Sequence, residues 1–493
     1  MICISINQES RRLALADMLN AARQADLLEV RLDRFGKAPD VGELVAKKPK
    51  PVIMSCRRPQ DGGFWDGTEQ DRLAILRQCI VSKADYVEIE LDAADNIRRF
   101  PPSQRVISYT NLQETPADIL DIYDEVKTKS PDVIKLVTLT RTPEEAWPLV
   151  QIAAKATVPT VIVGLGKPGV MLAILGQRIG APWIYAALER GMEAYPGQPT
   201  IDDLTSIYRF RDIQKSTRFV GVTGFGEREI ISVAALNAVF VQTESPYRCL
   251  PMAVGDWKIF RKVIDAVKLG ALVVDADHQS GILQIGSEPH GAAKTSHAAD
   301  VLIHKGDAWH AFHTAAATWI DGLKQMLAAK YPGDNPLKDR MVLIVGLNAA
   351  AAIVAAEVQR HGGSAILASH QKKAGQQLAE AIGCRFVQFE ALYTTMHDVL
   401  VVCAEEKHDD AKKPGGGIHS GYLKPGMAVM DLTAAVHPSQ LLRDAEVHGC
   451  LRMAPHELLL NQLTQQAKLL TGKTVGRDAL EKTIPERFRE EME

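Results

Sequence analysis

A lysine lies in the middle of a strongly apolar stretch, Pro131 to Thr140 (PDVIKLVTLT). The aliphatic and β-branched neighbours of Lys135 predict a buried strand. Burial disfavours the ammonium form and lowers the pKa of a lysine, and the resulting neutral amine is a nucleophile for carbonyl carbon. Lys135 is therefore a candidate for imine chemistry. The alternative is a lysine whose head reaches the strand end or pairs with a carboxylate, because lysine is rarely buried unpaired.

The elements that must position this lysine are β-rich runs that alternate with helical patterns. The predicted strands are Ile2–Ile6, Leu27–Asp33, Pro51–Arg57, Tyr86–Asp92, Arg105–Thr110, Val133–Leu139, Thr160–Gly166 and Trp183–Leu188. Alternation of strand and helix predicts an α/β protein with a parallel sheet. Repeated in this length of chain, it predicts a closed (β/α)8, or TIM, barrel over residues 1–214.

Charged side chains collect where these strands end. They include Glu29, Arg31, Arg57, Asp61, Glu88 and Glu90. The carboxyl ends of barrel strands meet at one mouth, so these groups should surround Lys135. Guanidinium groups beside a central lysine suit an anionic substrate that carries a carbonyl group, such as a cyclic keto acid.

Several motifs of this half resemble type I 3-dehydroquinate dehydratase, the Schiff-base lyase of the shikimate pathway of aromatic amino-acid biosynthesis. The motifs are EVRLD, CRRPQDGG, SYTNLQETP, IKLV and YPGQPT, in that family's order and spacing. The resemblance implies that Lys135 forms an imine with the ketone of 3-dehydroquinate, without a cofactor. An iminium acts as an electron sink, so a proton and then water can leave. The implied substrate contacts are Ser5, Glu29, Arg31, Arg57, Asp61 and Gln198.

Some positions depart from that family's pattern. The catalytic histidine of the family falls on Thr110, and threonine is no base at neutral pH. The arginine that grips the substrate carboxylate falls on Ala173, a serine near PGQ falls on Ala194, and Asp61 replaces a longer glutamate. Loss of a general acid or base lowers rates by roughly 10²–10⁴-fold. We therefore expect a weak dehydratase, an enzyme for a changed substrate, or an eroded protein that binds a metabolite or serves in an assembly.

The second half begins with a new strand at Arg218 (RFVGVTGF) and continues to alternate. Further strands are predicted at Val239–Thr243, Leu272–Ala276 and Gly281–Ile285, and helices at 255–269 and 311–327. From MVLIVGL onward the pattern predicts a doubly wound, Rossmann-like topology over 338–455, followed by a helix at 456–470. This order resembles shikimate dehydrogenase. The resemblance implies a substrate-binding domain at 218–330, completed by 456–475, and an NADP-binding domain at 338–455. A dehydratase barrel fused to such a module is the arrangement of the bifunctional family.

The same resemblance implies a second substrate cleft and a dinucleotide site. Its cleft positions are Ser232, Gln279 and Gln462, and its cofactor positions are Gly346, Asn348, Ala349 and Lys372. The family's catalytic lysine falls on Gln279, its partner aspartate on Ala315, and two phosphate-loop glycines on Asn348 and Ala349. These departures predict a degenerate dehydrogenase half and count against NADP. A working NADP oxidoreductase with a rebuilt site is the alternative.

Composition and residue spacing limit the remaining classes of function. A net charge of -3 gives no reason to expect nucleic-acid binding. The first residues show no basic, apolar leader, so we expect a cytoplasmic protein without a membrane segment. The composition is also compatible with a homo-oligomer. The seven cysteines form no CxxC pair, which is typical of a reducing compartment. The histidines between His278 and His313 lack the short ligand spacing of a metal motif, so no metal is expected. The charged run at 405–413 and the PGGGIH that follows predict a surface loop.

Overall fold

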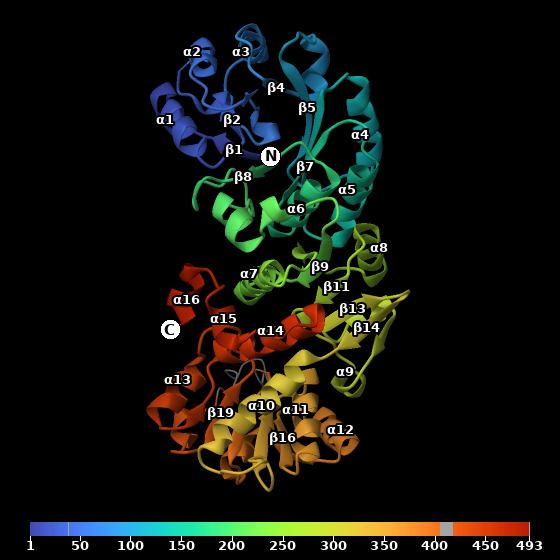
Figure 1. Cartoon of the computed structure of the whole chain (residues 1–493), viewed down its shortest axis with the longest axis vertical. Coiled ribbons are helices and arrows are strands. Elements are labelled where there is room, and N and C mark those ends of the chain that lie inside the picture. The colour runs from blue at the N-terminus through green and yellow to red at the C-terminus, as the bar shows by residue number, and fades with distance from the viewer. Residues whose placement is uncertain (38, 405–417, 493) are drawn as a thin grey trace. The chain divides into compact units, whose positions relative to one another are not determined.

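The computed structural model describes residues 1–37, 39–404 and 418–492, and the predicted loop at 405–413 lies outside them (Figure 1). The chain folds into two compact units. The first unit combines Met1–Phe225 with Pro246–Leu269, and the second combines Gly226–Ser245 with Gly270–Glu493. Among the described helices, none has both the length and the apolar character needed to cross a bilayer.

A nearly closed barrel of parallel strands forms most of the first unit, as the alternation of strands and helices predicts. Its strands are β1 (Ile2–Ile6), β2 (Leu27–Arg31), β3 (Val52–Ser55), β4 (Tyr86–Glu90), β5 (Gln104–Asn111), β6 (Val133–Leu139), β7 (Thr160–Leu165) and β8 (Ile184–Ala186). Strands β1 to β7 pair in sequence order, and β8 returns to pair with β1. The helices of this barrel are α1 (Arg11–Ala21), α2 (Val41–Ala46), α3 (Glu69–Val81), α4 (Ile119–Thr128), α5 (Pro143–Lys155) and α6 (Val170–Ile179).

The barrel interior contains an apolar core that surrounds the buried charged residues. Its buried members include Cys3, Leu27, Ile53, Val106, Val133, Val161, Trp183 and Tyr185. Side chains alternate between the two faces of a strand, so Val133 and Lys135 of β6 lie on the same face. Lys135 is aligned with Ser108 on β5 and Val161 on β7. The strand period therefore points Lys135 into the barrel, between Val133 and Val137 on the same face of β6.

The first unit also contains the parallel strands β9 (Arg218–Thr223) and β10 (Tyr247–Met252) and the helix α8 (Trp257–Val267). This helix falls within the predicted range 255–269. Its start is fixed by Asp256, whose Oδ1 accepts hydrogen bonds from the amides of Lys258 (2.9 Å) and Ile259 (3.0 Å). Such an N-cap satisfies amides that have no partner inside the helix.

The second unit begins with α7 (Glu227–Gln242), where the sequence prediction of a strand at Val239–Thr243 is wrong. Buried residues recur along the whole helix, among them Ile231, Leu236 and Phe240. The β-branched residues at the end of this run also fit a strand, because a short apolar run is compatible with both periods. The strand expected at Gly281–Ile285 is also wrong: Ile282–Ile285 is a 3-10 helix that ends at Gly286 with φ +82°.

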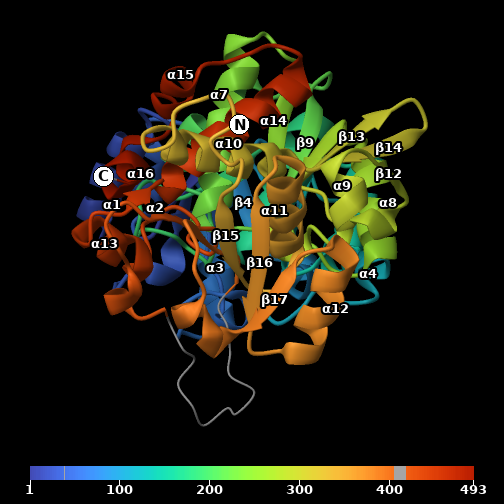
Figure 2. The same cartoon turned by 90° about the horizontal axis from the view of Figure 1, so that it is seen from below.

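Strands of a mixed sheet and a parallel sheet complete the second unit. The strands of the mixed sheet that lie in this unit, called the small sheet below, are β11 (Ala271–Val273), β13 (Val301–Lys305), β14 (Ala308–Phe312) and β12 (Ser287–Pro289), in that order. The parallel sheet has the order β17-β16-β15-β18-β19-β20, and β15, β16 and β17 are labelled in Figure 2. Its members are β15 (Met341–Val345), β16 (Ser364–Ser369), β17 (Arg385–Gln388), β18 (Val399–Val402), β19 (Ala428–Asp431) and β20 (Leu451–Arg452). Numbered along the chain this is 3-2-1-4-5-6, the doubly wound order of Rossmann folds.

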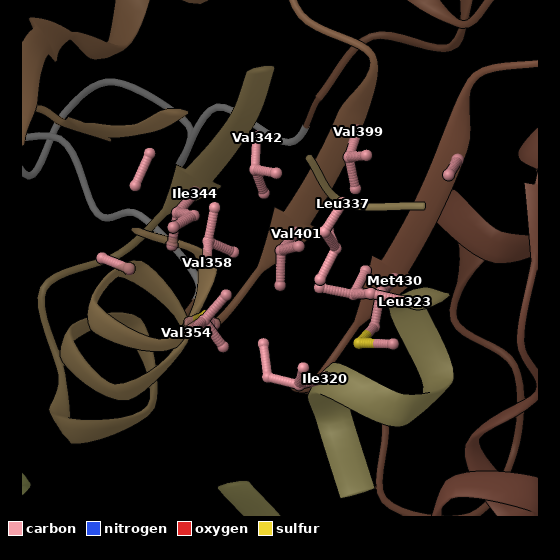
Figure 3. Close-up of a cluster of buried hydrophobic side chains, with 14 of the residues drawn as sticks. Ile320, Leu323, Leu337, Val342, Ile344, Val354, Val358, Val399, Val401 and Met430 are labelled. Atoms are coloured by element: carbon pink, nitrogen blue, oxygen red, sulfur yellow. The ribbon is translucent and has the colours of Figure 1, made fainter. Parts of the chain in front are cut away.

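Strand β15 is apolar on both faces because helices cover the parallel sheet on both sides. Val342 and Ile344 belong to one buried cluster, while Leu343 and Val345 belong to another. In Figure 3 the first cluster joins β15 and β18 to α10 (Thr314–Ala328) and α11 (Ala349–Arg360). The last long helix, α14 (Pro455–Thr471), packs against α10 and α7.

Candidate active site

Lys135 is buried inside the barrel and ion-paired. Its side chain is 2% exposed, and its Nζ lies 2.9 Å from Glu88 Oε2 and 3.6 Å from Glu29 Oε1. The same nitrogen lies 4.4 Å from the centre of the Tyr185 ring, within range of a cation–π contact. Lys135 of this apolar strand therefore lies in a charged cluster. This arrangement matches the alternative of a buried lysine that pairs with a carboxylate.

Arg57 binds the same two carboxylates as the lysine. Its Nε and Nη2 each lie 3.1 Å from an oxygen of Glu88, and Nη2 also donates to Glu29 Oε1. The other Glu29 oxygen accepts a 2.6 Å hydrogen bond from Ser5 Oγ. Each carboxylate is thus held by two cations, which fixes the position of Lys135 Nζ to within hydrogen-bond geometry.

The charge states in this cluster follow from burial and from the neighbouring charges. Burial works to raise the pKa of Glu29, but Arg57, Lys135 and Arg31 outweigh it and hold that pKa well below its ordinary value. Burial works against the charge of Arg57 as well, yet Glu29 and Glu88 raise its pKa well above the ordinary value. For Tyr185, burial together with the nearby carboxylates raises the pKa, so its hydroxyl is neutral.

Some buried polar atoms of the barrel have no protein partner among the described residues. Tyr185 Oη and Gln198 Nε2 are among them. The Gln198 side chain is anchored by its oxygen, which accepts a 2.7 Å hydrogen bond from the amide of Ala194. A buried donor left without a partner is unfavourable, and it commonly marks the position of a ligand or water.

Arg31 and Asp61 take part in separate ion pairs of the mouth. Arg31 donates to Asp33 from Nε (3.0 Å) and Nη2 (2.7 Å), and to the carbonyl of Gly62 (3.1 Å). Asp33 also accepts the amide of Phe64 at 3.0 Å, so this pair fastens the loop after β3. Asp61 accepts from Arg58 Nε at 2.7 Å. The contacts of Arg31 and Asp61 described here are therefore with groups other than Lys135.

Thr110 lies on the interior face of β5, one step beyond the lysine. Its cross-strand neighbour is Val137, while Ser108, two residues earlier, is aligned with Lys135. The threonine side chain is partly exposed. A larger side chain at this position would therefore lie above the amine, towards the open end of the barrel.

Sequence reasoning gave no substrate role to Glu88, which is the nearest partner of Lys135. The alternation in YVEIE, which places Glu88 on the same face as Tyr86, is a signal for it. Glu90 follows on the same face, but its partner is Arg72, with Nη1 2.6 Å from Oε2. Burial raises the pKa of Glu90 to about 7, against the opposing charge of Arg72. Glu90 therefore belongs to a second, separate buried pair.

The low pKa of Glu29 predicts a loss of stability in acid. Its ordinary pKa is 4.5, so its contribution is present above about pH 4.5 and is lost as pH falls through the lower folded value. We expect the free energy of unfolding to fall less steeply with acid in Glu29→Gln than in the unchanged chain. Urea unfolding at a series of pH values measures this. The exposed Glu125→Gln variant on α4 should keep the original slope, and an equal slope in Glu29→Gln would contradict the prediction.

The predicted cleft residues of the second unit are engaged with other protein groups. Gln462 donates to Asp300 Oδ2 at 2.8 Å and accepts from Arg228. Asp300 is completely buried and also accepts the amides of Thr314 (2.6 Å) and Ala315 (2.8 Å), which begin α10. Sequence reasoning assigned no role to Asp300 or Arg228, because their contacts with Gln462 join residues that are far apart in the sequence.

The side chains of the other two predicted cleft residues make hydrogen bonds to nearby carbonyl groups of the main chain. Ser232 Oγ donates to the carbonyl of Arg228 at 2.8 Å, one turn earlier in α7. The side chain of Gln279 donates to the carbonyl of Val274 at 3.4 Å. Neither hydrogen bond would prepare its side chain to donate a proton to a substrate.

The loop after β15 is shaped for a close turn but is filled by an asparagine. Gly346 has φ +115°, and a Cβ there would lie 2.9 Å from the amide of Ala404. Asn348 caps α11: its Oδ1 accepts the amide of Ala351 (3.0 Å) and its Nδ2 donates to the carbonyl of Cys403 (2.7 Å). A dinucleotide pyrophosphate would need those helix-start amides and that space.

The two remaining cofactor positions lie at the starts of helices. Ala349 is the first residue of α11, and Lys372 is the exposed first residue of α12 (Lys372–Ile382). His370, just before α12, lies 3.1 Å from Glu390 through Nδ1. An asparagine cap and an exposed lysine therefore stand where the resemblance implies cofactor contacts.

Fold and site define the class of the first unit: a (β/α)8 barrel protein whose mouth is built on a buried, carboxylate-paired lysine. Residues 2–215 match the sequence model described as type I 3-dehydroquinase. The 3-dehydroquinate dehydratase of Methanopyrus kandleri is 32% identical over 185 residues, covering 36% of this chain and 84% of the relative. The chain belongs to the type I 3-dehydroquinase family, a family of dehydratase-like lyases of the shikimate pathway.

Other similarities extend over the second half. The bifunctional chloroplastic 3-dehydroquinate dehydratase/shikimate dehydrogenase of Arabidopsis thaliana is 24% identical over 471 residues, covering 91% of this chain and 78% of the relative. The solved dehydroquinate dehydratase and shikimate dehydrogenase of S. pombe AroM aligns at TM-score 0.44 and 16% identity, covering 98% of each chain. Shikimate dehydrogenase from Aquifex aeolicus aligns at TM-score 0.47 and 18% identity, covering 55% of this chain and 98% of that one.

Proposed function

We propose that the barrel converts 3-dehydroquinate to 3-dehydroshikimate through a Schiff base on Lys135. The observation that supports this most is the position of Lys135 Nζ, buried and 2.9 Å from Glu88 Oε2. An amine must lose a proton before it attacks a ketone, and Glu88 is placed to accept that proton. Arg57 holds Glu88 in place through two hydrogen bonds.

The reaction then follows from imine chemistry. The amine adds to the ketone carbon, and loss of water from the carbinolamine gives a cationic iminium. This cation draws electrons from the adjacent carbon, so a proton leaves that carbon and the β-hydroxyl departs as water. Hydrolysis of the conjugated imine releases the enone and restores Lys135. Tyr185 Oη and Gln198 Nε2, which have no protein partner among the described residues, are available to bind oxygens of the ring or carboxylate.

We propose further that turnover is slow. Water loss and imine hydrolysis both need a proton donor or acceptor, and Thr110 cannot fill that role. The second candidate function, metabolite binding without turnover, follows from the same defect. The two differ in whether product accumulates.

A progress curve with 3-dehydroquinate tests the proposal. The enone product is conjugated and the substrate is not, so ultraviolet absorbance reports turnover directly. We expect product to form faster with the protein than in buffer. If product forms no faster than in buffer while calorimetry still detects substrate binding, the dehydratase proposal is wrong and the metabolite-binding function replaces it.

For the second unit, we propose that the pyrophosphate site of the dehydrogenase family has been lost. The Asn348 side chain uses an amide at the start of α11 that a phosphate would bind. The shikimate dehydrogenase structure solved with NADP+ reports binding in that protein, and we assign no NADP-dependent step to this chain.

Replacing Asn348 tests this loss. Glycine is nearly as good an N-cap as asparagine, so Asn348→Gly should change stability by only a few tenths of a kcal/mol while opening the loop. We expect NADPH fluorescence titration to show no saturation for the unchanged chain and measurable binding for Asn348→Gly. Asn348→Asp keeps the cap but repels phosphate, so it should not bind. Equal NADPH affinity in all three proteins would contradict the proposal.

A further inference from the structure

Two strands of the small sheet bring a carboxylate and two imidazoles to one face. Glu288 on β12 is aligned with His310 on β14, and the amide of His290 donates to the carbonyl of Ala311 at 2.9 Å. β12 and β14 pair in parallel, and both are labelled in Figure 2. Glu288 and His290 are two residues apart in an extended segment, so their side chains share a face.

The three side chains converge on one small volume. His290 Nε2 lies 2.9 Å from His310 Nδ1, and His310 Nδ1 lies 3.5 Å from Glu288 Oε2. All three ligand atoms lie within 4.8 Å of one another. Around a tetrahedral ion with bonds of about 2.0–2.2 Å, donor atoms lie about 3.3–3.5 Å apart. The distance from Glu288 Oε2 to His310 Nδ1 already has this value. The two imidazole nitrogens need to separate by only about 0.4 Å to reach it.

One of the imidazoles is also fixed by packing. The His290 ring stacks on Phe312, with centroids 5.2 Å apart and planes inclined by 18°. Phe312 is two residues beyond His310 on β14 and so lies on the same face. A ligand whose ring plane is already restrained loses less conformational freedom when it binds an ion.

We propose that Glu288, His290 and His310 form a binding site for one divalent transition-metal ion of the zinc class. Two imidazoles and one carboxylate are borderline ligands that favour Zn²⁺, Co²⁺ or Ni²⁺ over Mg²⁺. Three protein ligands leave a fourth position for water. The site is independent of the lyase chemistry proposed for the barrel, and a bound ion would tie the short strand β12 to β14.

Sequence spacing could not reveal this site. The two histidines are 20 residues apart, outside the short intervals of zinc motifs, and strand pairing alone brings them together. The histidine-rich segment from His278 to His313 is the only sequence signal that relates to it.

Metal titration of the chelator-treated full chain tests the proposal. We expect Zn²⁺ to bind one-to-one by calorimetry, and Co²⁺ to give visible absorption bands of a four-coordinate site that Zn²⁺ then removes. His290→Ala, His310→Ala and the surface substitution Glu288→Gln should each weaken binding by more than about 100-fold, beyond the roughly 10–100-fold effect typical of residues that only support ligands.

His304→Ala is the matched control. His304 lies on the neighbouring strand β13, and its ring packs 4.9 Å from Trp309. It should leave Zn²⁺ affinity and the Co²⁺ bands unchanged. Absence of one-to-one binding, or equal loss in His304→Ala and Glu288→Gln, would overturn the proposal and leave a simple hydrogen bond between two imidazoles.

Discussion

Replacing Lys135 by methionine is expected to abolish conversion of 3-dehydroquinate, leaving only the rate in buffer. The methionine can fill the apolar part of the space but supplies no amine for the imine. It also leaves Glu29 and Glu88 buried with one cation fewer. Removing one partner of a buried ion pair lowers the free energy of unfolding by about 3–5 kcal/mol. The measurements are the ultraviolet progress curve and urea unfolding.

A double variant separates the two effects of this substitution. Lys135→Met with Glu88→Gln removes a charge of each sign, so it should regain part of the lost stability. Activity should stay absent in both variants. Full activity in Lys135→Met would contradict the assignment of the nucleophile, and no recovery of stability in the double variant would contradict the ion pair.

Replacing Thr110 by histidine is expected to raise turnover by about 10²–10⁴-fold, the usual contribution of a general acid or base. The position faces the barrel interior one step beyond Lys135 and is partly exposed, so an imidazole can enter it from the open end. The gain should depend on pH with an apparent pKa near about 6.5, the ordinary value for histidine. Steady-state rates across a pH series measure it.

Thr110→Gln is the control for size and hydrogen bonding. Glutamine has polar atoms at a similar reach but does not titrate, so it should leave turnover close to that of the unchanged chain. If histidine gives no gain while the melting temperature is unchanged, the explanation of slow turnover by a missing proton relay is wrong.

The barrel could be predicted because its signals are local and repeated. Each strand is a short apolar run bounded by a helical pattern, and the predicted runs overlap β1 to β8. The errors fall where one local signal fits two structures. Val239–Thr243 is β-branched but completes α7, because the buried face of that helix extends to Phe240. Helix packing overrides local propensity there.

The candidate site was predictable only in part. An apolar strand around Lys135 indicates burial, and the alternation of β2 places Glu29 inside with it. The sequence could not say that Glu88 would be nearer than Arg31, because a partner across a barrel depends on the curvature of the sheet. The pairing of Asp300 with Gln462 was hidden as well, since the two residues lie 162 positions apart in the sequence.

Borohydride reduction in the presence of 3-dehydroquinate tests the central claim most directly. Reduction fixes a Schiff base as a stable secondary amine, which peptide mass spectrometry can locate even when turnover is slow. We predict a single adduct on the peptide that contains Lys135, with none in Lys135→Met and an undiminished one after Lys155→Arg on the exposed surface of α5. An intact chain without an adduct, or an adduct that persists in Lys135→Met, would contradict the account.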